Sequence, residues 1–186
     1  MDVEEAIRSR RTVKAFEHEP VDRRTVEELL ELARWAPNHN LTNPWRFRVL
    51  GARSLASLKV AAAELALGDA PADADRGKVG EAAAAKLDRA PTLVVLSVRR
   101  SSDPVQDEED GHAAACAGYI VLLAAHARGL AAYWRTPAVL RSEAGRAAVG
   151  LPGDERFVGL LHLGRARQSA DPPERAEPGQ YVSFLD

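Results

Sequence analysis

The chain has 186 residues, of which 46% are hydrophobic and 28% charged, so it can bury a sizeable core and is not disordered throughout. Its 25 basic and 27 acidic side chains leave a formal net charge of −2, which argues against a nucleic-acid or membrane-surface partner. Cys116 is the only cysteine, which excludes an internal disulfide and a cysteine metal cluster. No apolar run reaches the roughly 20 residues of a membrane-spanning helix, and the acidic start is unlike a signal peptide. We therefore expect a cytoplasmic protein with a single domain over residues 1–186.

The first part of the chain predicts two capped helices. Asp2 and Glu5 have the spacing of a capping box at the start of a short helix, which leads into a basic stretch at residues 8–16. Asp22 can cap a second helix, whose apolar residues recur at intervals of three and four positions. Pro37 ends this second helix, because proline lacks an N–H group and disfavours helix in the residue before it.

The next segments predict a loop, a strand and two more helices. Residues 38–43 are polar and lie between two prolines. Residues 45–49 alternate between apolar and basic side chains, which is typical of a strand with one solvent-exposed face. Helices are predicted at residues 54–67 and 79–87, and the residues between them, which include Gly, Asp and Pro, predict a loop.

The centre of the chain is the most apolar part. Residues 92–98 form an apolar run of strand length, which predicts a central strand covered on both faces. Residues 99–109 are charged and predict a loop, and residues 108–110 are interpreted as a solvated helix start. Residues 111–128 then predict a helix that is apolar on all sides, so it needs burial in the core or against a second subunit. Cys116 inside it is expected to be a small buried side chain.

The last part of the chain predicts strands at residues 131–134 and 157–163, with a helix at 142–149 between them. Residues 180–185 are also strand-like, yet nothing in the chain obviously pairs with them. Because helices and strands interleave along the sequence, the fold class is mixed α and β.

Common nucleotide and metal motifs are missing. Neither the G-x-G-x-x-G sequence of dinucleotide-binding domains nor the G-x-x-x-x-G-K-[ST] sequence of P-loops occurs. The five histidines include no pair at the spacing of a metal site, so we expect no bound metal.

The basic stretch after the first helix is the first candidate binding feature. It combines Arg8, Arg10 and Arg11 with the hydroxyls of Ser9 and Thr12. Guanidinium groups and a hydroxyl beside free backbone N–H groups suit a phosphate, which needs charge-assisted donors from several directions. From local sequence alone, a solvated basic surface explains these residues equally well.

Two further segments are candidates for ligand contacts. Residues 36–45 form a loop rich in amide and imidazole groups, which could bind the polar edge of a heterocycle or could simply be a polar turn. Residues 133–137 end a predicted strand, where loops commonly carry ligand contacts. The alternative for this second segment is that Trp134 anchors the core.

Together and in this order, these segments resemble the FMN-dependent nitroreductase family, in particular its short bacterial NAD(P)H nitroreductases. The resemblance covers the chain from Val3 to Gly164. The matching motifs are RRTVKAF (10–16), LARWAP (32–37), NPWRF (43–47), APTLVV (90–95), GLAAYWRT (129–136) and GLLHLG (159–164).

The resemblance implies an α+β, nitroreductase-like three-layer fold, in which helices flank a mixed central sheet. It also implies a homodimer with two FMN molecules at the subunit interface. A dimer accounts for the all-apolar helix, which can pack against its counterpart, and for the unpaired strand at residues 181–185, which can be exchanged with the partner's sheet.

The resemblance also assigns site residues. Arg10, Arg11 and Thr12 hold the FMN phosphate and the ribityl end, and His39 and Asn43 reach the flavin from the partner subunit. The isoalloxazine ring or its chain is lined by Trp134, Arg135 and Thr136.

Four positions bear on how well the family pattern carries over. Thr12 stands where the family usually has serine, Asn43 where glutamine is common, and Lys14 where arginine is usual. The family's C-terminal basic residue for the phosphate is left open among Arg165, Arg167 and Arg175.

The implied function is an FMN-dependent oxidoreductase in which NAD(P)H, a transient donor, passes a hydride to bound flavin. The flavin then reduces a nitroaromatic, a quinone or a related small acceptor by a ping-pong mechanism. The chemistry lies on the flavin, so no side chain is assigned as a catalytic acid or base. The alternatives are a flavin-binding protein that stores or senses FMN without efficient turnover, and a structural domain without flavin.

Overall fold

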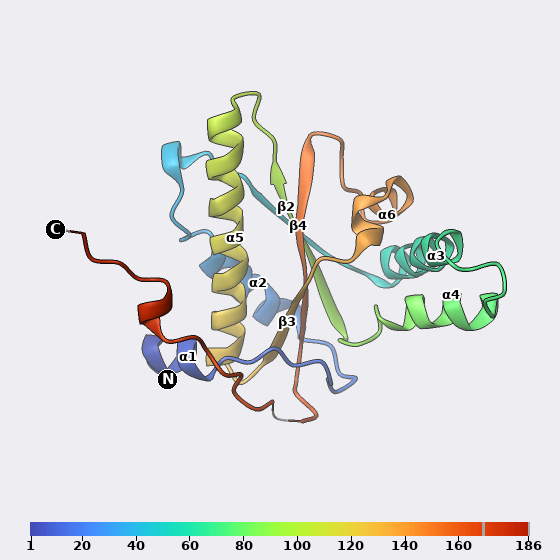
Figure 1. Cartoon of the computed structure of the whole chain (residues 1–186), viewed down its shortest axis with the longest axis horizontal. Helices are drawn as coiled ribbons and strands as arrows, with labels where there is room; N and C mark the ends of the chain where they lie inside the picture. Colours follow the sequence, from blue (N-terminus) through green and yellow to red (C-terminus); the bar gives the residue numbers. More distant parts are fainter. Residues whose placement is uncertain (169, 186) are drawn as a thin grey trace.

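The computed structural model describes residues 1–168 and 170–185, and it is built around a four-stranded sheet (Figure 1). The strands lie in the order β1 (Trp45–Val49), β2 (Thr92–Arg99), β4 (Glu155–Gly164) and β3 (Ala131–Arg135). β1 and β3 are therefore the edge strands of this sheet, whereas β2 and β4 are central.

Every neighbouring pair of these strands is antiparallel, so the mixed sheet that we predicted is not present among them. β2 and β3 run in the same direction and are joined through α5 (Pro104–Ala127), as in a parallel crossover. β4 lies between them and runs the opposite way, which makes both contacts antiparallel. A parallel contact occurs outside the named strands, at the bridge between Thr12 and Ala132.

Helices cover both faces of the sheet (Figure 1). One face, with Val94 and Leu161, packs against α2 and α5. The other face, with Leu93 and Leu160, packs on the side of α3 and α6. The other helices are α1 (Val3–Ser9), α2 (Arg23–Ala33), α3 (Ala52–Gly68), α4 (Arg76–Ala85), α6 (Glu143–Ala148) and the short η1 (His39–Leu41), η2 (Ala138–Arg141) and η3 (Pro178–Gln180).

The first two helices begin at the caps that the sequence predicts. Asp2 accepts a hydrogen bond of 2.8 Å from the Glu5 N–H group. Asp22 accepts one of 2.9 Å from the Thr25 N–H group and one of 2.6 Å from the Thr25 hydroxyl. The segment between these helices passes beside β3, because the Val13 N–H group donates to the Ala132 carbonyl at 3.3 Å.

The prediction of a loop over residues 99–109 is wrong for its second half. α5 begins at Pro104, and the Asp103 carboxylate caps it by accepting from the Val105 N–H group at 2.9 Å. Asp followed by Pro is a helix-start signal that the surrounding charges obscured. Asp110 therefore lies two turns inside the helix and is only 4% exposed, so it is not part of a solvated helix start.

α5 has one face that the other described residues do not cover. Val105, His112, Cys116 and Tyr119 lie along this exposed face. The expectation that Cys116 is buried is therefore wrong for this chain by itself. The sheet and α2 cover α5 from one side only, so an all-apolar composition does not place every residue inside.

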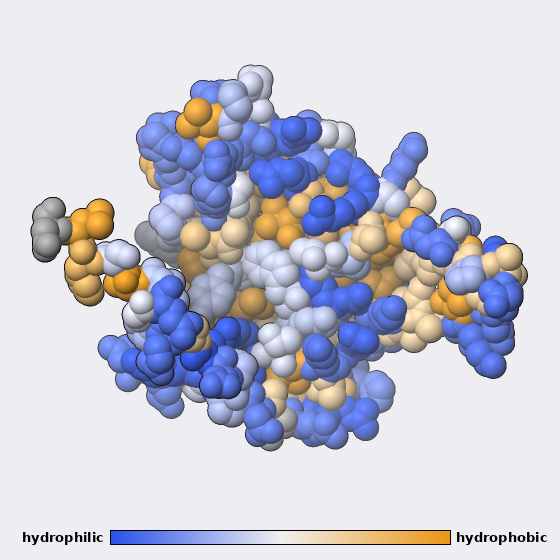
Figure 2. Space-filling view, in the orientation of Figure 1, coloured by the Kyte–Doolittle hydropathy of each residue, from blue (hydrophilic) through white to orange (hydrophobic). Residues whose placement is uncertain are grey.

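Residues 181–185 form no strand in this chain, contrary to the prediction. After η3 the tail runs away from the sheet (Figure 1). Phe184 and Leu185 are 94% and 93% exposed, and Figure 2 shows hydrophobic side chains at this end of the tail. Strand exchange with a partner stays a prediction. No helix among the described residues is long and apolar enough to cross a membrane.

Candidate functional site

A cavity of about 340 Å³ lies beside the C-terminal end of α5. Ser9, Arg10 and Arg11 line it from the end of α1, and His126 lines it from the last turn of α5. Residues 129–132, where the chain enters β3, also border it. The pairing of Thr12 with Ala132 holds the arginine segment against this strand, which places basic side chains and main chain around one space.

Arg10 and Arg11 differ in how their guanidinium groups are used. Arg11 donates to the carbonyl oxygens of Arg8 at 2.6 Å and Arg10 at 2.9 Å, which stabilises the end of α1. Arg10 lies with its guanidinium carbon 6.0 Å from the centre of the Tyr119 ring. Its Nε is buried and has no hydrogen-bond partner among the described residues. Such an orphaned charged donor is costly unless a ligand satisfies it.

The loop of residues 38–43 is held at the other end of α5. His39 Nδ1 lies 2.7 Å from a Glu109 carboxylate oxygen, and Asn40 donates to the Gln106 side chain at 2.8 Å. The Thr42 hydroxyl donates to buried Asp110 at 2.5 Å. Asn43 uses its side-chain amide inside the loop, donating to the Leu41 carbonyl at 2.7 Å.

These two groups of predicted residues are far apart within one chain. His39 contacts α5 at residue 109, whereas Ser9 contacts it at residue 126. Residues 109 and 126 are 17 positions apart, which corresponds to about 25 Å along a helix at 1.5 Å per residue. His39 and Arg10 of the same chain are therefore not brought together in one site.

The predicted residues at the end of β3 are divided between two faces of the sheet. A Cβ added at Gly118 or Gly159 would meet the Trp134 ring within 2.4–2.8 Å, so the indole packs between α5 and β4. Arg135 points to the opposite face, where it donates to the Lys86 carbonyl at 3.0 Å. Successive side chains of a strand alternate in this way. Thr136 is exposed just beyond the strand.

A histidine from the last motif is buried behind Tyr133. His162 is fully buried, and its ring centre lies 5.2 Å from that of Tyr133. Burial lowers its pKa to about 4, and the charge of Arg135 contributes to this shift. The imidazole is thus neutral near neutral pH. No cluster of three His, Cys, Asp or Glu side chains that could bind a metal occurs within residues 1–168 and 170–185.

Comparison with known proteins identifies the family of this fold. Residues 7–165 match the sequence model of the nitroreductase family. The chain belongs to the nitroreductase family. The family resemblance drawn from the motifs is thereby confirmed, together with the α+β fold class.

Named relatives match over most or all of the chain, and a solved structure has the same fold. A Bacillus subtilis protein, "Putative NAD(P)H nitroreductase YfhC", is 26% identical over 170 residues, which is 91% of this chain and 87% of that protein. "Putative NAD(P)H nitroreductase YdjA" of Escherichia coli K12 is 26% identical over 190 residues and all of both chains. A nitroreductase-like protein from Bacillus cereus has a TM-score of 0.86 at 24% identity, covering 100% of this chain and 97% of that one. This last similarity shows the fold.

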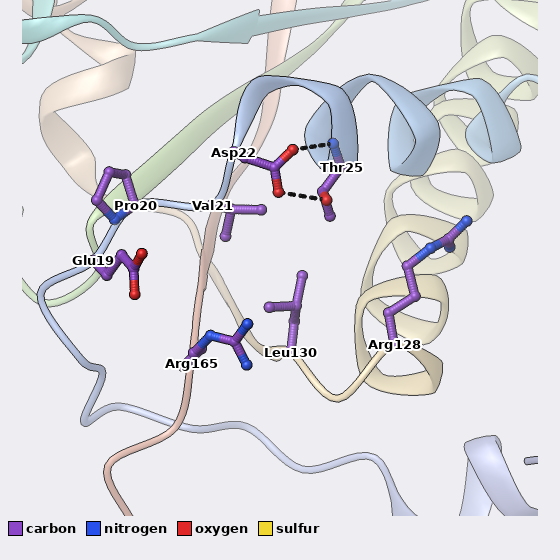
Figure 3. Close-up of a pocket in the computed structure, with 8 residues that line it drawn as sticks. All are labelled: Glu19, Pro20, Val21, Asp22, Thr25, Arg128, Leu130 and Arg165. Atoms are coloured by element: carbon purple, nitrogen blue, oxygen red, sulfur yellow. Dashed lines mark hydrogen bonds between the residues drawn. The ribbon is translucent and has the colours of Figure 1, made fainter.

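The family's C-terminal phosphate residue was left open among three arginines, and the structure places each of them differently. Arg165 lines a small pocket with Glu19 and Asp22, as Figure 3 shows. Arg167 lines a groove on the side of Lys14. Arg175 is exposed in the tail. None of the three lines the cavity that contains Arg10.

Three polar residues around α5 were missed by the family motifs. His126 lies in the arginine cavity, and Asp110 and Gln106 hold the loop at the other end. Gln106 and Asp110 are four residues apart on the helix and share a hydrogen bond of 3.0 Å. That spacing could have suggested a common face, but their partners come from a loop more than 60 positions earlier, which local sequence does not reveal.

Proposed function

We propose that this member of the nitroreductase family is an FMN-dependent oxidoreductase that takes its electrons from NAD(P)H. Its acceptor is a nitroaromatic, a quinone or a related small molecule, reduced in a ping-pong sequence. Arg10 carries the proposal, because it lines the cavity, its buried Nε has no hydrogen-bond partner among the described residues, and a phosphate monoester supplies an anionic acceptor. Relatives named as NAD(P)H nitroreductases support it.

The chain's own residues can hold the two ends of such a cofactor. Arg10, which lines the cavity, and Thr12, an exposed residue that is not among the lining residues, would bind the phosphate, while Arg11 stabilises the end of α1. Bound FMN would supply the redox chemistry by accepting a hydride and returning electrons to the second substrate. Protein groups therefore orient the ring and exclude water rather than act as acid or base.

The edge of β3 offers main-chain contacts to the ring. The Ala132 carbonyl points away from β4, since it accepts from Val13. Backbone groups alternate in direction along an antiparallel strand, so the N–H and C=O groups of Trp134 point to the same open edge. We therefore assign the polar contacts of the isoalloxazine to the Trp134 backbone, while its indole positions the strand by packing on Gly118 and Gly159.

A homodimer completes the site in this proposal. The loop of residues 38–43 is about 25 Å from the arginine cavity of its own chain, as helix geometry requires. In a two-fold dimer, the same loop of the second copy can approach that cavity. The exposed face of α5, with Cys116 and Tyr119, and the hydrophobic tail end offer apolar surface for this contact.

The proposal is tested by purifying the full chain and recording its visible spectrum. We expect flavin absorbance, release of FMN on denaturation, and bleaching when NADPH or NADH is added without oxygen. Re-oxidation by a nitroaromatic or a quinone would then complete the cycle. Bound flavin that is not reduced would indicate storage or sensing instead, and protein that does not bind added FMN would contradict any flavin function.

A further inference from the structure

His126 is placed in the arginine cavity by a defined hydrogen bond. Its Nε2 lies 2.7 Å from the Ser9 hydroxyl oxygen. The Ser9 hydroxyl donates its own proton to the Glu5 carbonyl at 2.6 Å, so the oxygen can only accept from the histidine. In the neutral ring the proton is therefore on Nε2, and Nδ1 is free of a proton.

The charges around His126 favour this neutral form. Burial lowers its pKa, and the positive charges of Arg10 and Arg11 lower it further. Glu5 of α1 acts in the opposite direction but has a smaller effect. Met1, at the start of the chain, also borders the cavity. Arg10 and Arg11 line the cavity and Glu5 does not, so the charged side chains around it are basic.

We propose that His126 is an additional binding residue for the cofactor phosphate and takes up a proton from solvent when that phosphate binds. The inference rests on the proposed function. A phosphate monoester carries a charge of about −1.5 to −2 near neutral pH. Beside Arg10 and Arg11 this charge offsets the repulsion that keeps the imidazole neutral. The protonated ring then gains an Nδ1–H donor, while Nε2 keeps its bond to Ser9.

The protonation of His126 on binding determines how FMN affinity depends on pH. In the free protein the pKa of His126 lies below its ordinary value, and in the complex the phosphate raises it. Between the two values, binding consumes a proton, so FMN affinity rises as the pH falls, by up to about tenfold per pH unit. FMN's own phosphate, with a second pKa of about 6, acts in the opposite direction. That contribution is the same for every variant and cancels in a comparison.

The test is calorimetric titration of the full chain, freed of flavin, with FMN at pH 6.5 in two buffers of different ionisation enthalpy. This pair of measurements yields the number of protons taken up. We expect the wild-type chain to take up more protons than His126→Gln, by a fraction of one proton. His18→Gln, at an exposed position outside both α5 and the cavity, is the matched control and should behave as wild type. Riboflavin, which lacks the phosphate, should show no difference between wild type and His126→Gln.

Equal proton uptake by wild type and His126→Gln, with FMN bound, would overturn the inference and leave the proposed function intact. Failure of the wild-type chain to bind both FMN and riboflavin would overturn both. If His126→Gln does not fold, the wild-type imidazole can be followed by NMR. A pKa that rises on adding FMN but not riboflavin supports the inference, and an unchanged pKa overturns it.

Discussion

At the N-terminal end of α5, acidic and amide side chains form hydrogen bonds with a loop of the same chain. At its C-terminal end, basic side chains line a cavity instead. Asp110 accepts from Thr42 at 2.5 Å and Glu109 lies 2.7 Å from His39. At the other end, Arg10 keeps a buried Nε without a partner among the described residues. One helix thus has hydrogen-bonded side chains at its N-terminal end (the completed end) and, at its C-terminal end (the incomplete end), an arginine donor without a partner in the described part of the chain.

The completed end also holds a strained loop. Asn40, Leu41 and Asn43 have φ values of 59°, 51° and 47°, in the left-handed region that favours glycine. Each such residue costs on the order of 1–3 kcal/mol and persists only where the surroundings determine it. The contacts to Gln106, Glu109 and Asp110 hold the loop in this conformation. At the N-terminal end of α5 these hydrogen bonds hold a loop, whereas at the C-terminal end Arg10 has a buried donor without a partner among the described residues, which an anionic ligand would satisfy.

The largest expected effect is on FMN binding at the C-terminal end of α5, where Arg10 lies. Arg10→Ala should weaken FMN binding about tenfold to a hundredfold, because a hydrogen bond to a charged group contributes about 1.5–3 kcal/mol. Riboflavin affinity should change little, and the free energy of unfolding should not fall, because the buried Arg10 Nε has no hydrogen-bond partner to lose among the described residues. Fluorescence titration and urea unfolding measure the three quantities. Arg8→Ala is the control, since its side chain is 81% exposed. Equal loss of riboflavin and FMN would show that Arg10 is structural.

A substitution at the N-terminal end of α5 should instead change the free energy of unfolding. Thr42→Val removes the hydroxyl that donates to Asp110 and leaves a buried carboxylate short of one partner. We expect the free energy of unfolding to fall by about 1–3 kcal/mol in urea denaturation. Thr42→Ser keeps the donor and should stay close to wild type. If the two variants are equally stable, this hydrogen bond does not hold the loop.

Gly118 lies in the middle of α5, between the two ends. There is no room at this position for a larger side chain. A Cβ at Gly118 would lie 2.4 Å from the Trp134 ring and 2.7 Å from a Leu96 methyl group. Overpacking costs about 1–3 kcal/mol, and helix propensity returns up to about 1 kcal/mol, so Gly118→Ala should destabilise by about 1 kcal/mol. Gly68→Ala, in α3 with open space around it, should stabilise slightly. A stabilised Gly118→Ala would show that Trp134 moves aside freely.

The smallest expected effect is on the amount of FMN bound by a mixed dimer. In such a dimer, the loop of residues 38–43 of one chain and the arginine cavity of the other form a shared site. A mixed dimer of Arg10→Ala and His39→Ala chains should bind about one FMN tightly, because both changes fall on one shared site and the other site is intact. Each mutant homodimer has a defect in both sites and should bind weakly. Tightly bound FMN is counted per purified mixed dimer. A count near zero would mean that His39 serves the site of its own chain.

Local signals were sufficient for much of the fold. The helix starts at Asp2 and Asp22 depend on side chain and backbone a few residues apart, so capping patterns predict them. β2 is buried along residues 92–98, as its uninterrupted apolar run indicates. The order of the motifs was likewise enough to identify the family, because it reflects the whole chain rather than any one segment.

What the sequence by itself determined is therefore the starts of α1 and α2, the buried run of β2 and the family to which the chain belongs. Tertiary structure decided how each polar group is used. Arg48, predicted on a solvent-exposed face, binds Glu155, which is only 7% exposed. Asp110 is buried and hydrogen-bonded, Trp134 and Arg135 face opposite sides of the sheet, and Arg10 has a buried donor without a partner in the part of the chain that the structure describes. Each outcome depends on partners distant in sequence, and short-range periodicity contains no information about which distant groups meet.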